Sequence, residues 1–360
     1  MRLALAYNAK PIARSEIVAS RPELIPDAEE EPPPLSGVGA SDDVYAEWDD
    51  APTVLALADA LARRHDVILI EADSRFPRRV SRLKPDLVFN VAEGMWGPAR
   101  EAQVPAVLEM LGIPYTGSDA LTLAVCLHKG WANTILQSYG IPTPRHLVVS
   151  ETAALTAPLD LAFPLMVKPL HEGSSKGILN DQVVSSPDVL LDRVARLLRD
   201  YRQPVLIEEF LSGREFTVAV LGNLPTLRVL PPVELRFDML PPGAAPIYSW
   251  EAKWVWDTPD APLDVFECPA QLSPDEYADL VLVCRATAET LRIKDWARMD
   301  LRMDARGKIH VLEVNPLPGM LPDPAAHSCY PKAARAAGMD YAEVILAVVD
   351  TACQRWGLQT

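Results

Sequence analysis

The sequence predicts an α/β protein, because short apolar runs alternate with helical segments from its first residues onward. Apolar runs at residues 3–7, 67–71 and 87–91 have the length and composition of buried strands, and residues 53–64 have helical periodicity. Strands that are joined through a helix lie parallel in one sheet. We therefore expect a parallel α/β unit in the first part of the chain.

Later segments continue the same alternation. Helices are expected at residues 99–111 and 119–139, where Gly112 and Gly140 act as stop signals. Further elements are predicted as strands at residues 163–169, 205–209 and 215–221, and as helices at residues 331–337 and 341–356. Residues 231–267 are rich in Pro and Trp without a clear period, which predicts a loop over a site.

Composition indicates a globular cytoplasmic protein. The 360 residues are enough for two or three domains, and no apolar run approaches the roughly 18–20 residues of a membrane span. The first apolar run is too short for a signal peptide. The cysteines have no paired short spacing, so we expect reduced and mostly buried thiols at Cys126, Cys268, Cys284, Cys329 and Cys353.

Negative charge dominates the chain. A net charge of -15 argues against nucleic-acid binding, which needs a basic face. Residues 22–50 contain ten Asp or Glu and no Lys or Arg. This segment cannot bury enough apolar area to offset the entropy of ordering, so we expect a mobile loop. A functional lid and a solvated insertion both remain open for it.

A tight hairpin is predicted to join two apolar segments, residues 296–303 and 308–314. Asp304 and Gly307 are residue types that accept the positive φ angles of such turns. We therefore expect these two residues to pair and to close the hairpin.

This register places polar side chains on one face of the hairpin. Arg298 then lies opposite Glu313, Asp300 lies opposite Val311, and Asp300 is diagonal to Glu313 at roughly 7–8 Å. Alternation brings Asn315 to the same face. Two carboxylates and an amide suit Mg²⁺ better than Zn²⁺, which prefers His or Cys. A merely solvated polar face is the alternative.

Other segments have the chemistry of a nucleotide site. Glycine and serine in residues 172–177 allow backbone N–H groups to approach phosphate oxygens, although a hairpin turn without function would look the same. Lys168 alternates away from its apolar neighbours and so needs an anion or solvent. Lys129 has the ordinary interpretation of an exposed helix lysine.

An acidic connector follows the apolar run at residues 205–207. Glu208 and Glu209 can offer a carboxylate and backbone groups to an adenine edge, or can end an edge strand in water. Glu215 can accept hydrogen bonds from ribose hydroxyls or can face solvent.

Taken together, these motifs carry a family resemblance. In chain order they are Lys168-Pro, Glu172-Gly-Ser-Ser, Val205-Leu-Ile-Glu208, Leu211-Ser-Gly-Arg-Glu215-Phe-Thr-Val, Glu251-Ala-Lys253, Arg298-Met-Asp300, Glu313-Val-Asn315, Pro318-Gly-Met320, and His327-Ser328 ahead of Ala333-Ala-Arg. Over residues 85–350 the chain resembles the D-alanine–D-alanine ligases, which are ATP-grasp carboxylate–amine ligases. The joint occurrence of the motifs is specific, although each one alone is weak.

The resemblance implies an α/β ATP-grasp fold of three α/β domains. They would be an N-terminal pre-ATP-grasp domain at residues 1–118 with the acidic insertion at about 22–50, a central domain at 119–208, and a C-terminal domain at 209–360 with a covering loop at about 231–267. ATP would be clamped between the central and C-terminal domains. The resemblance also suggests a homodimer formed through the N-terminal domain.

The implied reaction joins two amino-acid-like substrates by an amide bond. The γ-phosphoryl group of ATP would pass to one carboxylate, and the amine of the second substrate would attack the acyl phosphate. Three alternatives stay open: a ligase of the same mechanism for other amino acids or a dipeptide, phosphoryl transfer without ligation, and a catalytically silent nucleotide-binding regulatory module.

Site residues follow from the resemblance. Those implied for ATP are Lys129, Lys168, Glu172, Ser174, Ser175, Glu208, Glu209, Phe210, Leu211, Glu215 and Lys253. Two Mg²⁺ ions, or Mn²⁺, would bind Asp300, Glu313 and Asn315. Catalysis would use Arg298, Ser174, Gly319 and Lys253. Substrates would contact Ser328, Gly319, Trp254, Glu16 and Glu93.

Departures from the family pattern cluster around the first amino-acid subsite. The N-terminal Gly-Gly loop and its glutamate are absent, and Glu16 is the expected replacement. Trp254 stands where the family has tyrosine, and an indole can donate only through its N–H. Glu93 lies in a loop that replaces a histidine-containing one, so Glu93 or Arg100 is expected to touch substrate. The reaction therefore looks preserved, while the amino acids stay open.

Overall fold

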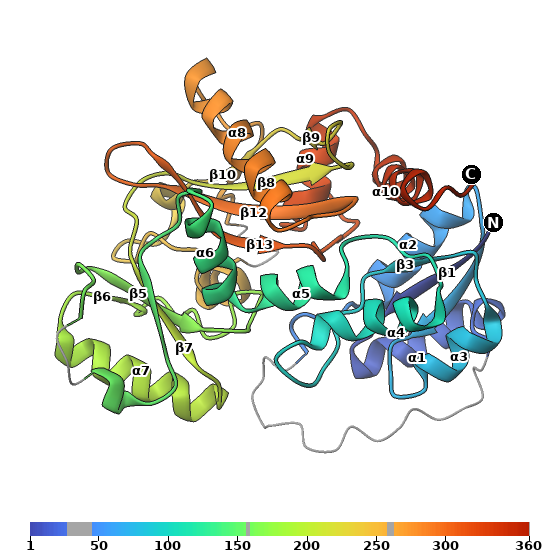
Figure 1. Cartoon of the computed structure of the whole chain (residues 1–360), viewed down its shortest axis with the longest axis horizontal. Coiled ribbons are helices and arrows are strands. Elements are labelled where there is room, and N and C mark those ends of the chain that lie inside the picture. Colours follow the sequence, from blue (N-terminus) through green and yellow to red (C-terminus); the bar gives the residue numbers. More distant parts are fainter. Residues whose placement is uncertain (27–44, 156–158, 258–262, 360) are drawn as a thin grey trace.

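A computed structural model describes residues 1–26, 45–155, 159–257 and 263–359 (Figure 1). Its first sheet has the strand order β2-β1-β3 and consists of β1 (Arg2–Tyr7), β2 (Asp66–Glu71) and β3 (Leu87–Asn90). Both pairings are parallel, which confirms the predicted parallel α/β unit.

Helices surround this parallel sheet. They are α1 (Pro11–Ser20), η1 (Pro22–Leu24), α2 (Ala51–Ala62), α3 (Phe76–Leu83), η2 (Arg100–Ala102) and α4 (Gln103–Leu111). Asp50 is the N-cap residue of α2, because its carboxylate accepts the backbone N–H of Thr53 at 3.0 Å. Most of the predicted acidic loop, residues 27–44, lies outside the described residues. Its last part, residues 45–50, leads into α2.

The helix predicted at residues 119–139 is in fact two helices, α5 (Ala120–Leu127) and α6 (Lys129–Ser138). His128 leaves the helical conformation, and its ring Nδ1 accepts the backbone N–H of Trp131 at 3.0 Å. At Gly130 an added Cβ would lie 2.5 Å from a side-chain carbon of Val148, so only glycine permits this close packing. The break makes Lys129 the first residue of α6, where it is buried.

A second, antiparallel sheet has the strand order β4-β7-β5-β6. Its strands are β4 (His146–Val149), β5 (Leu165–Pro169), β6 (Val183–Val184) and β7 (Val205–Glu209), and η3 (Thr152–Leu155) and α7 (Pro187–Tyr201) accompany it. Leu165 and Val167 of β5 pack with Leu190 and Val194 of α7 in one apolar cluster. Lys168 points to the other face, as its alternation predicts.

A third, antiparallel sheet has the order β11-β10-β8-β12-β13, and β9 pairs with β8. Its elements are β8 (Glu215–Leu221), β9 (Arg228–Val229), β10 (Val233–Leu235), β11 (Phe266–Glu267), β12 (Trp296–Met303) and β13 (Ile309–Asn315), with α8 (Pro274–Thr290) packed on one face. The predicted loop at 231–267 is wrong in part. It contributes β10 and β11, together with η4 (Phe237–Met239) and the π-helical η5 (Ala252–Trp256).

The hairpin between β12 and β13 forms, but its predicted register is wrong. Arg298 pairs with Asn315, and Asp300 pairs with Glu313, whereas the predicted partners were Glu313 and Val311. The two acidic residues are therefore direct cross-strand neighbours rather than diagonal ones.

Two local features of the hairpin displace the register by one residue each. The backbone N–H of Asp304 donates to the carbonyl of Lys308 at 2.9 Å, so the turn is longer than predicted. A β-bulge next to Asp300 leaves Leu312 as an extra residue on β13. Because the two displacements add to an even number, the predicted set of polar side chains still shares one face.

The C-terminal helices connect the third sheet to the first one. They are α9 (Cys329–Ala336) and α10 (Tyr341–Trp356), and α10 lies beside α2 in Figure 1. Leu57 and Leu61 of α2 share an apolar core with Ile345 and Val349 of α10. The first part of the chain therefore completes its core with the last helix.

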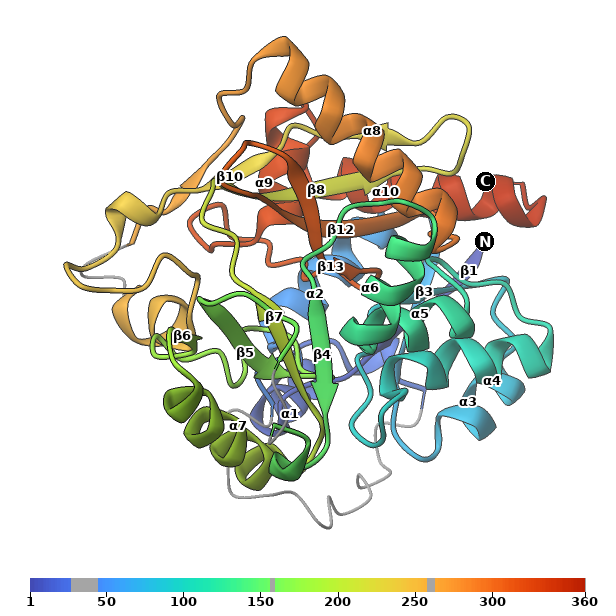
Figure 2. The ribbon, with the colours of Figure 1, turned by 60° about the vertical axis from the view of Figure 1, so that its left-hand side comes forward.

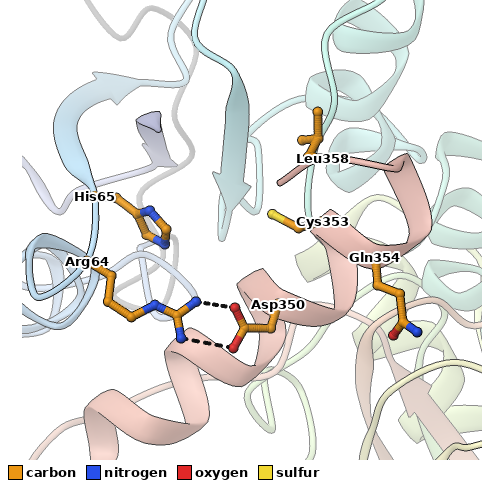
Figure 3. Close-up of a pocket in the computed structure, with 6 residues that line it drawn as sticks. All are labelled: Arg64, His65, Asp350, Cys353, Gln354 and Leu358. Carbon is orange, nitrogen blue, oxygen red and sulfur yellow. Dashed lines mark hydrogen bonds and ion pairs between the residues drawn. The ribbon is translucent and has the colours of Figure 1, made fainter. Parts of the chain in front are cut away.

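A hollow marks the rim of this junction (Figure 3). It is lined by Arg64, His65, Asp350, Cys353, Gln354 and Leu358. Arg64 donates to Asp350 with 3.0 Å between Nη1 and Oδ2, and both side chains are exposed to solvent. Such an exposed pair contributes little to stability. In the part of the chain that the structure describes, no helix is long and apolar enough to cross a membrane.

A buried carboxylate joins several units of the fold. Asp295 is fully buried and accepts the backbone N–H of Gly117 at 2.8 Å and the side-chain amide of Asn223 at 2.9 Å. Arg355 of α10 donates to it through Nε at 3.0 Å and Nη2 at 2.6 Å. The acceptor capacity of this ionised group is thus filled.

We expect Asp295→Ala to lower the free energy of unfolding by about 3–5 kcal/mol, because it leaves the Arg355 guanidinium without its counterion. Urea unfolding followed by circular dichroism measures the loss. Asp350→Ala, which removes the partner of Arg64 on α10, is the matched control, with an expected loss of about 0–1 kcal/mol. Equal losses in the two variants would contradict the assigned role of Asp295.

Candidate active site

The main pocket is lined by residues of the second and third sheets and of the first unit, which is the N-terminal part that contains the parallel sheet. Figure 2 shows how the ribbons of these parts are arranged. Its cavity volume is about 310 Å³. Strands β5 and β7 supply one side, and β12 and β13 supply the facing side. Residues that are far apart in the sequence therefore meet here.

With one exception, the predicted site residues line this pocket. They are Glu93, Lys129, Lys168, Glu172, Ser174, Ser175, Glu208, Glu209, Phe210, Leu211, Glu215, Lys253, Trp254, Arg298, Asp300, Glu313, Asn315, Gly319 and Ser328. The exception is Glu16. Helix α1 buries Ala13 and Ile17, whereas Glu16 is exposed beside them and lies outside the pocket lining.

Two buried lysines line the pocket, one from β5 and one from the start of α6. Lys168 is 5% exposed, and its Nζ lies 2.7 Å from Oε1 of Glu208. Lys129 is 3% exposed, donates to the carbonyl of Glu172 at 2.6 Å, and lies 3.1 Å from Oε1 of Glu313. The ordinary expectation of an exposed Lys129 is therefore wrong, because the break before α6 turns this residue inward.

One carboxylate oxygen of the connector lacks a protein partner. Oε2 of Glu208 is buried and accepts no hydrogen bond from any residue that the structure describes. An unsatisfied buried oxygen costs free energy unless a donor reaches it. It is therefore suited to accept an N–H group of a ligand.

Asp300 and Glu313 form the acidic centre of the β12–β13 face. Asp300 accepts from Nη2 of Arg298 at 2.9 Å and from the hydroxyl of Thr217 at 2.7 Å. Burial would raise the pKa of Glu313, but Lys129 and neighbouring cations outweigh it and lower that pKa. Asn315 accepts a backbone N–H through its side-chain oxygen.

These ligand types are all oxygens, which fits a hard cation such as Mg²⁺. No group of three His, Cys, Asp or Glu residues close enough to hold a metal ion occurs among the described residues. Protein donors at this face are therefore limited to two carboxylates and an amide, a set that leaves coordination positions for phosphate oxygens and water.

The segment of residues 231–267, predicted as a covering loop, brings Lys253 and Trp254 to the pocket. Burial removes the Lys253 ammonium from water and Arg298 repels it, so its pKa falls to about 8. Its Nζ lies 5.2 Å from the centre of the Trp254 ring. The indole N–H of Trp254 points to the carbonyl of Ser174 at 3.4 Å, a contact that a single N–H donor can make.

Two further predicted residues are held by the protein itself. Ser328 donates to the carbonyl of Gly319 at 2.9 Å and accepts the backbone N–H of Leu321 at 3.2 Å, so it shapes the loop after β13. Glu215 accepts from Nη1 of Arg302 at 2.8 Å. Its carboxylate therefore lies at the pocket with a fixed orientation.

Sequence reasoning missed Glu47, which ties the first unit to the glycine-rich loop. Its carboxylate accepts from Nη2 of Arg100 at 3.0 and 2.9 Å, from the N–H of Gly173 at 2.7 Å and from Lys176 at 3.0 Å. Burial alone would raise its pKa, but Arg100 and Lys176 outweigh that effect and bring it to about 2. Glu47 lies in a strongly acidic segment, and the only local sign that it could be buried is the large apolar side chain of the neighbouring Trp48.

Three more carboxylates line the wall beside Glu47, and they are Asp49, Glu93 and Glu101. Burial raises the pKa of Asp49 to about 7 and that of Glu101 to about 7, and it raises the pKa of Glu93 as well. Glu93 thus lies at the pocket as predicted. Arg100 does not line the pocket but binds Glu47 behind it.

Comparisons with known proteins agree with this geometry. The family described as "D-ala D-ala ligase C-terminus" matches residues 135–350. An uncharacterised protein of Sinorhizobium fredii is 36% identical over 81% of this chain and 84% of its own length. D-alanine–D-alanine ligase B of Pseudomonas putida is 35% identical over 82% of this chain and 85% of its own length.

A solved structure shares the fold. The D-alanine–D-alanine ligase of Bacillus anthracis complexed with ATP superposes with a TM-score of 0.68 at 21% identity, covering 99% of this chain and 98% of that one. This likeness confirms the predicted ATP-grasp fold.

We expect Glu101→Gln to stabilise the protein at alkaline pH. The folded pKa of Glu101, about 7, lies above its ordinary value of 4.5, so ionisation costs stability as the pH rises through this window. Glutamine cannot ionise, and the gain over wild type should be roughly 2 kcal/mol larger at about pH 8 than at about pH 5. Urea unfolding at both pH values measures it.

Glu16→Gln is the matched control, because it removes a carboxylate that is exposed on the same unit. Its effect should be the same at both pH values. A Glu101→Gln variant that is less stable than wild type at pH 8 would show that the ionised carboxylate is well accommodated.

Proposed function

The chain belongs to the D-alanine–D-alanine ligase family, the ATP-dependent ligases that form an amide bond, and we propose that its main pocket holds ATP and two amino-acid substrates for this reaction. One observation carries the proposal. Helix α6, strand β5 and the β12–β13 hairpin bring the buried Lys129 and Lys168 together with the paired acids Asp300 and Glu313. Lysines for phosphates and oxygen ligands for a metal thus share one cavity.

ATP is oriented by groups at both walls. Lys129 and Lys168 bind the α- and β-phosphates, and Lys253 binds the γ-phosphate. The free Oε2 of Glu208 accepts the adenine amino group, which supports this orientation because that oxygen has no partner among the described residues. Glu215 accepts hydrogen bonds from the ribose.

Other predicted residues complete the nucleotide site, and they are Glu172, Ser174, Ser175, Glu209, Phe210 and Leu211. Asp300, Glu313 and Asn315 would hold Mg²⁺, with two ions expected and Mn²⁺ as a substitute. Bound metal would neutralise charge on the phosphates and on the transferring group.

The chain's own residues stabilise the charge that develops in both steps. A carboxylate oxygen attacks the γ-phosphorus, the bond to the β-phosphate oxygen breaks, and ADP leaves. The amine nitrogen then attacks the acyl carbon, phosphate leaves, and the amine loses a proton. Arg298 and the N–H of Gly319 face the negative charge, while Ser174 and Ser328 orient the substrates.

A catalytically silent nucleotide-binding module is the alternative from another class. It has no need of a metal-binding acid beside an arginine. We expect Asp300→Asn to reduce ATP-dependent amide formation at least about 100-fold, because it removes charge where the metal and the transition state need it. ADP release and product mass, measured with ATP, Mg²⁺ and pairs of amino acids, test this.

Asp279→Asn, an exposed change on α8, serves as the control and should retain full turnover. Thermal unfolding of Asp300→Asn must resemble that of wild type, so that lost activity reports chemistry. Undiminished turnover in Asp300→Asn would reject the assigned role of the β12–β13 face. ATP hydrolysis without amide product would favour phosphoryl transfer alone.

We propose that the protein acts in the cytoplasm, where ATP is available, and as a homodimer formed through its first unit. Met110 of α4 and Leu121 of α5 support the dimer, because these apolar side chains on neighbouring helices are 86% and 65% exposed. Light scattering should give twice the chain mass of 39.5 kDa, and Met110→Glu should reduce it to one chain. A single-chain mass for wild type would reject the dimer.

A further inference from the structure

Three carboxylates at one wall of the main pocket have no partner. Asp49, Glu93 and Glu101 line the cavity, and their side chains make no hydrogen bond or ion pair with any residue that the structure describes. We call them the acidic wall. Glu101 is only 8% exposed, so it is a nearly buried carboxylate that opens toward the cavity. Buried carboxylates without a counterion are costly.

The cations that attract the acidic wall most strongly are already bound to other groups. Arg100 acts on both Glu93 and Glu101, but its guanidinium is bound to Glu47 and to a backbone carbonyl. Lys129 acts on Glu101, but its ammonium is bound to the Glu313 carboxylate and to the backbone carbonyl of Glu172.

Asp49 also lacks a cation that compensates its burial. Lys10 attracts its carboxylate, yet burial still dominates and raises the pKa of Asp49. The raised pKa values of Glu93 and Glu101 have the same cause. The surrounding cations therefore do not offset the cost of burying these three carboxylates in their ionised form.

A metal ion does not fit this wall. Among the described residues, no three acids, histidines or cysteines lie close enough together to share one ion. The carboxylates come from the segment before α2, from the loop after β3 and from η2, and the three do not converge on one point. Carboxylates that do not converge on one point suit an extended organic cation rather than a single metal ion.

The α-ammonium of an ordinary amino acid brings only one positive charge. Glu47 is already saturated by three cationic or backbone donors. We propose, resting on the ligase function above, that one of the two substrates is an amino acid with a second cationic group, an amine or guanidinium, which the acidic wall binds. The reaction at its carboxylate or α-amine is unchanged by this group.

Paired substrates that differ only in charge test the proposal. Ornithine is compared with norvaline and arginine with citrulline, each as both enantiomers and each combined with itself and with both enantiomers of alanine. Wild-type enzyme is assayed for ADP and for amide product by mass. We expect kcat/KM to be at least about tenfold higher for the cationic member of a pair, the gain typical of a charged hydrogen bond.

Glu101→Gln probes the wall itself. It keeps the side-chain volume and removes the charge, so the ratio of kcat/KM between ornithine and norvaline, or between arginine and citrulline, should fall at least about threefold toward unity. Glu16→Gln, which removes an exposed charge from the same unit, should keep the wild-type ratio. Thermal unfolding of both variants verifies that they are folded.

The outcomes separate this proposal from the ligase function. Amide formation from neutral amino acids that equals or exceeds that from their cationic isosteres overturns the cationic substrate and leaves the ligase function standing. An unchanged ratio in Glu101→Gln overturns the role of the acidic wall. Absence of ADP and amide with every pair, and also with D-alanine as both substrates, overturns the ligase function and this proposal with it.

Discussion

The buried Asp295 carboxylate fixes the geometry on which the pocket depends. It binds the end of the first unit through Gly117 and the last helix through Arg355. Strand β12 starts at the next residue, so the positions of Arg298 and Asp300 are set from this anchored point. A charge that is satisfied only when several segments meet specifies one arrangement of those segments, because any other arrangement leaves it buried and unpaired.

Each of three cations inside the pocket is paired with a carboxylate, an arrangement that suits a polyanionic ligand. Lys129 is bound to Glu313, Lys168 to Glu208, and Arg298 to Asp300. Each pair combines a cation suited to phosphate with an acid suited to metal or adenine. Under the proposed function, a bound metal nucleotide would replace one set of partners by another, so no lysine or carboxylate would lose its counterion when the ligand enters.

Local signals were sufficient for some elements and insufficient for others. Strands β7 and β8 match their predicted limits, because apolar runs end there at polar residues and a glycine turn. The β12–β13 face was predicted with its correct set of side chains, but a bulge has no sequence signature and changed the register. Glu47 could not be found locally, since its donors come from segments more than fifty residues away.

The shared core of α2 and α10 has a consequence for the synthesis of the chain. Helix α10 begins about 280 residues after α2 ends. At ribosomal rates of about 5–20 residues per second, the apolar face of α2 waits for its cover for roughly 15 to 55 seconds. Throughout that interval the part of α2 that α10 later covers stays accessible to other chains and to chaperones, so the yield in the cell depends on what binds to that surface first.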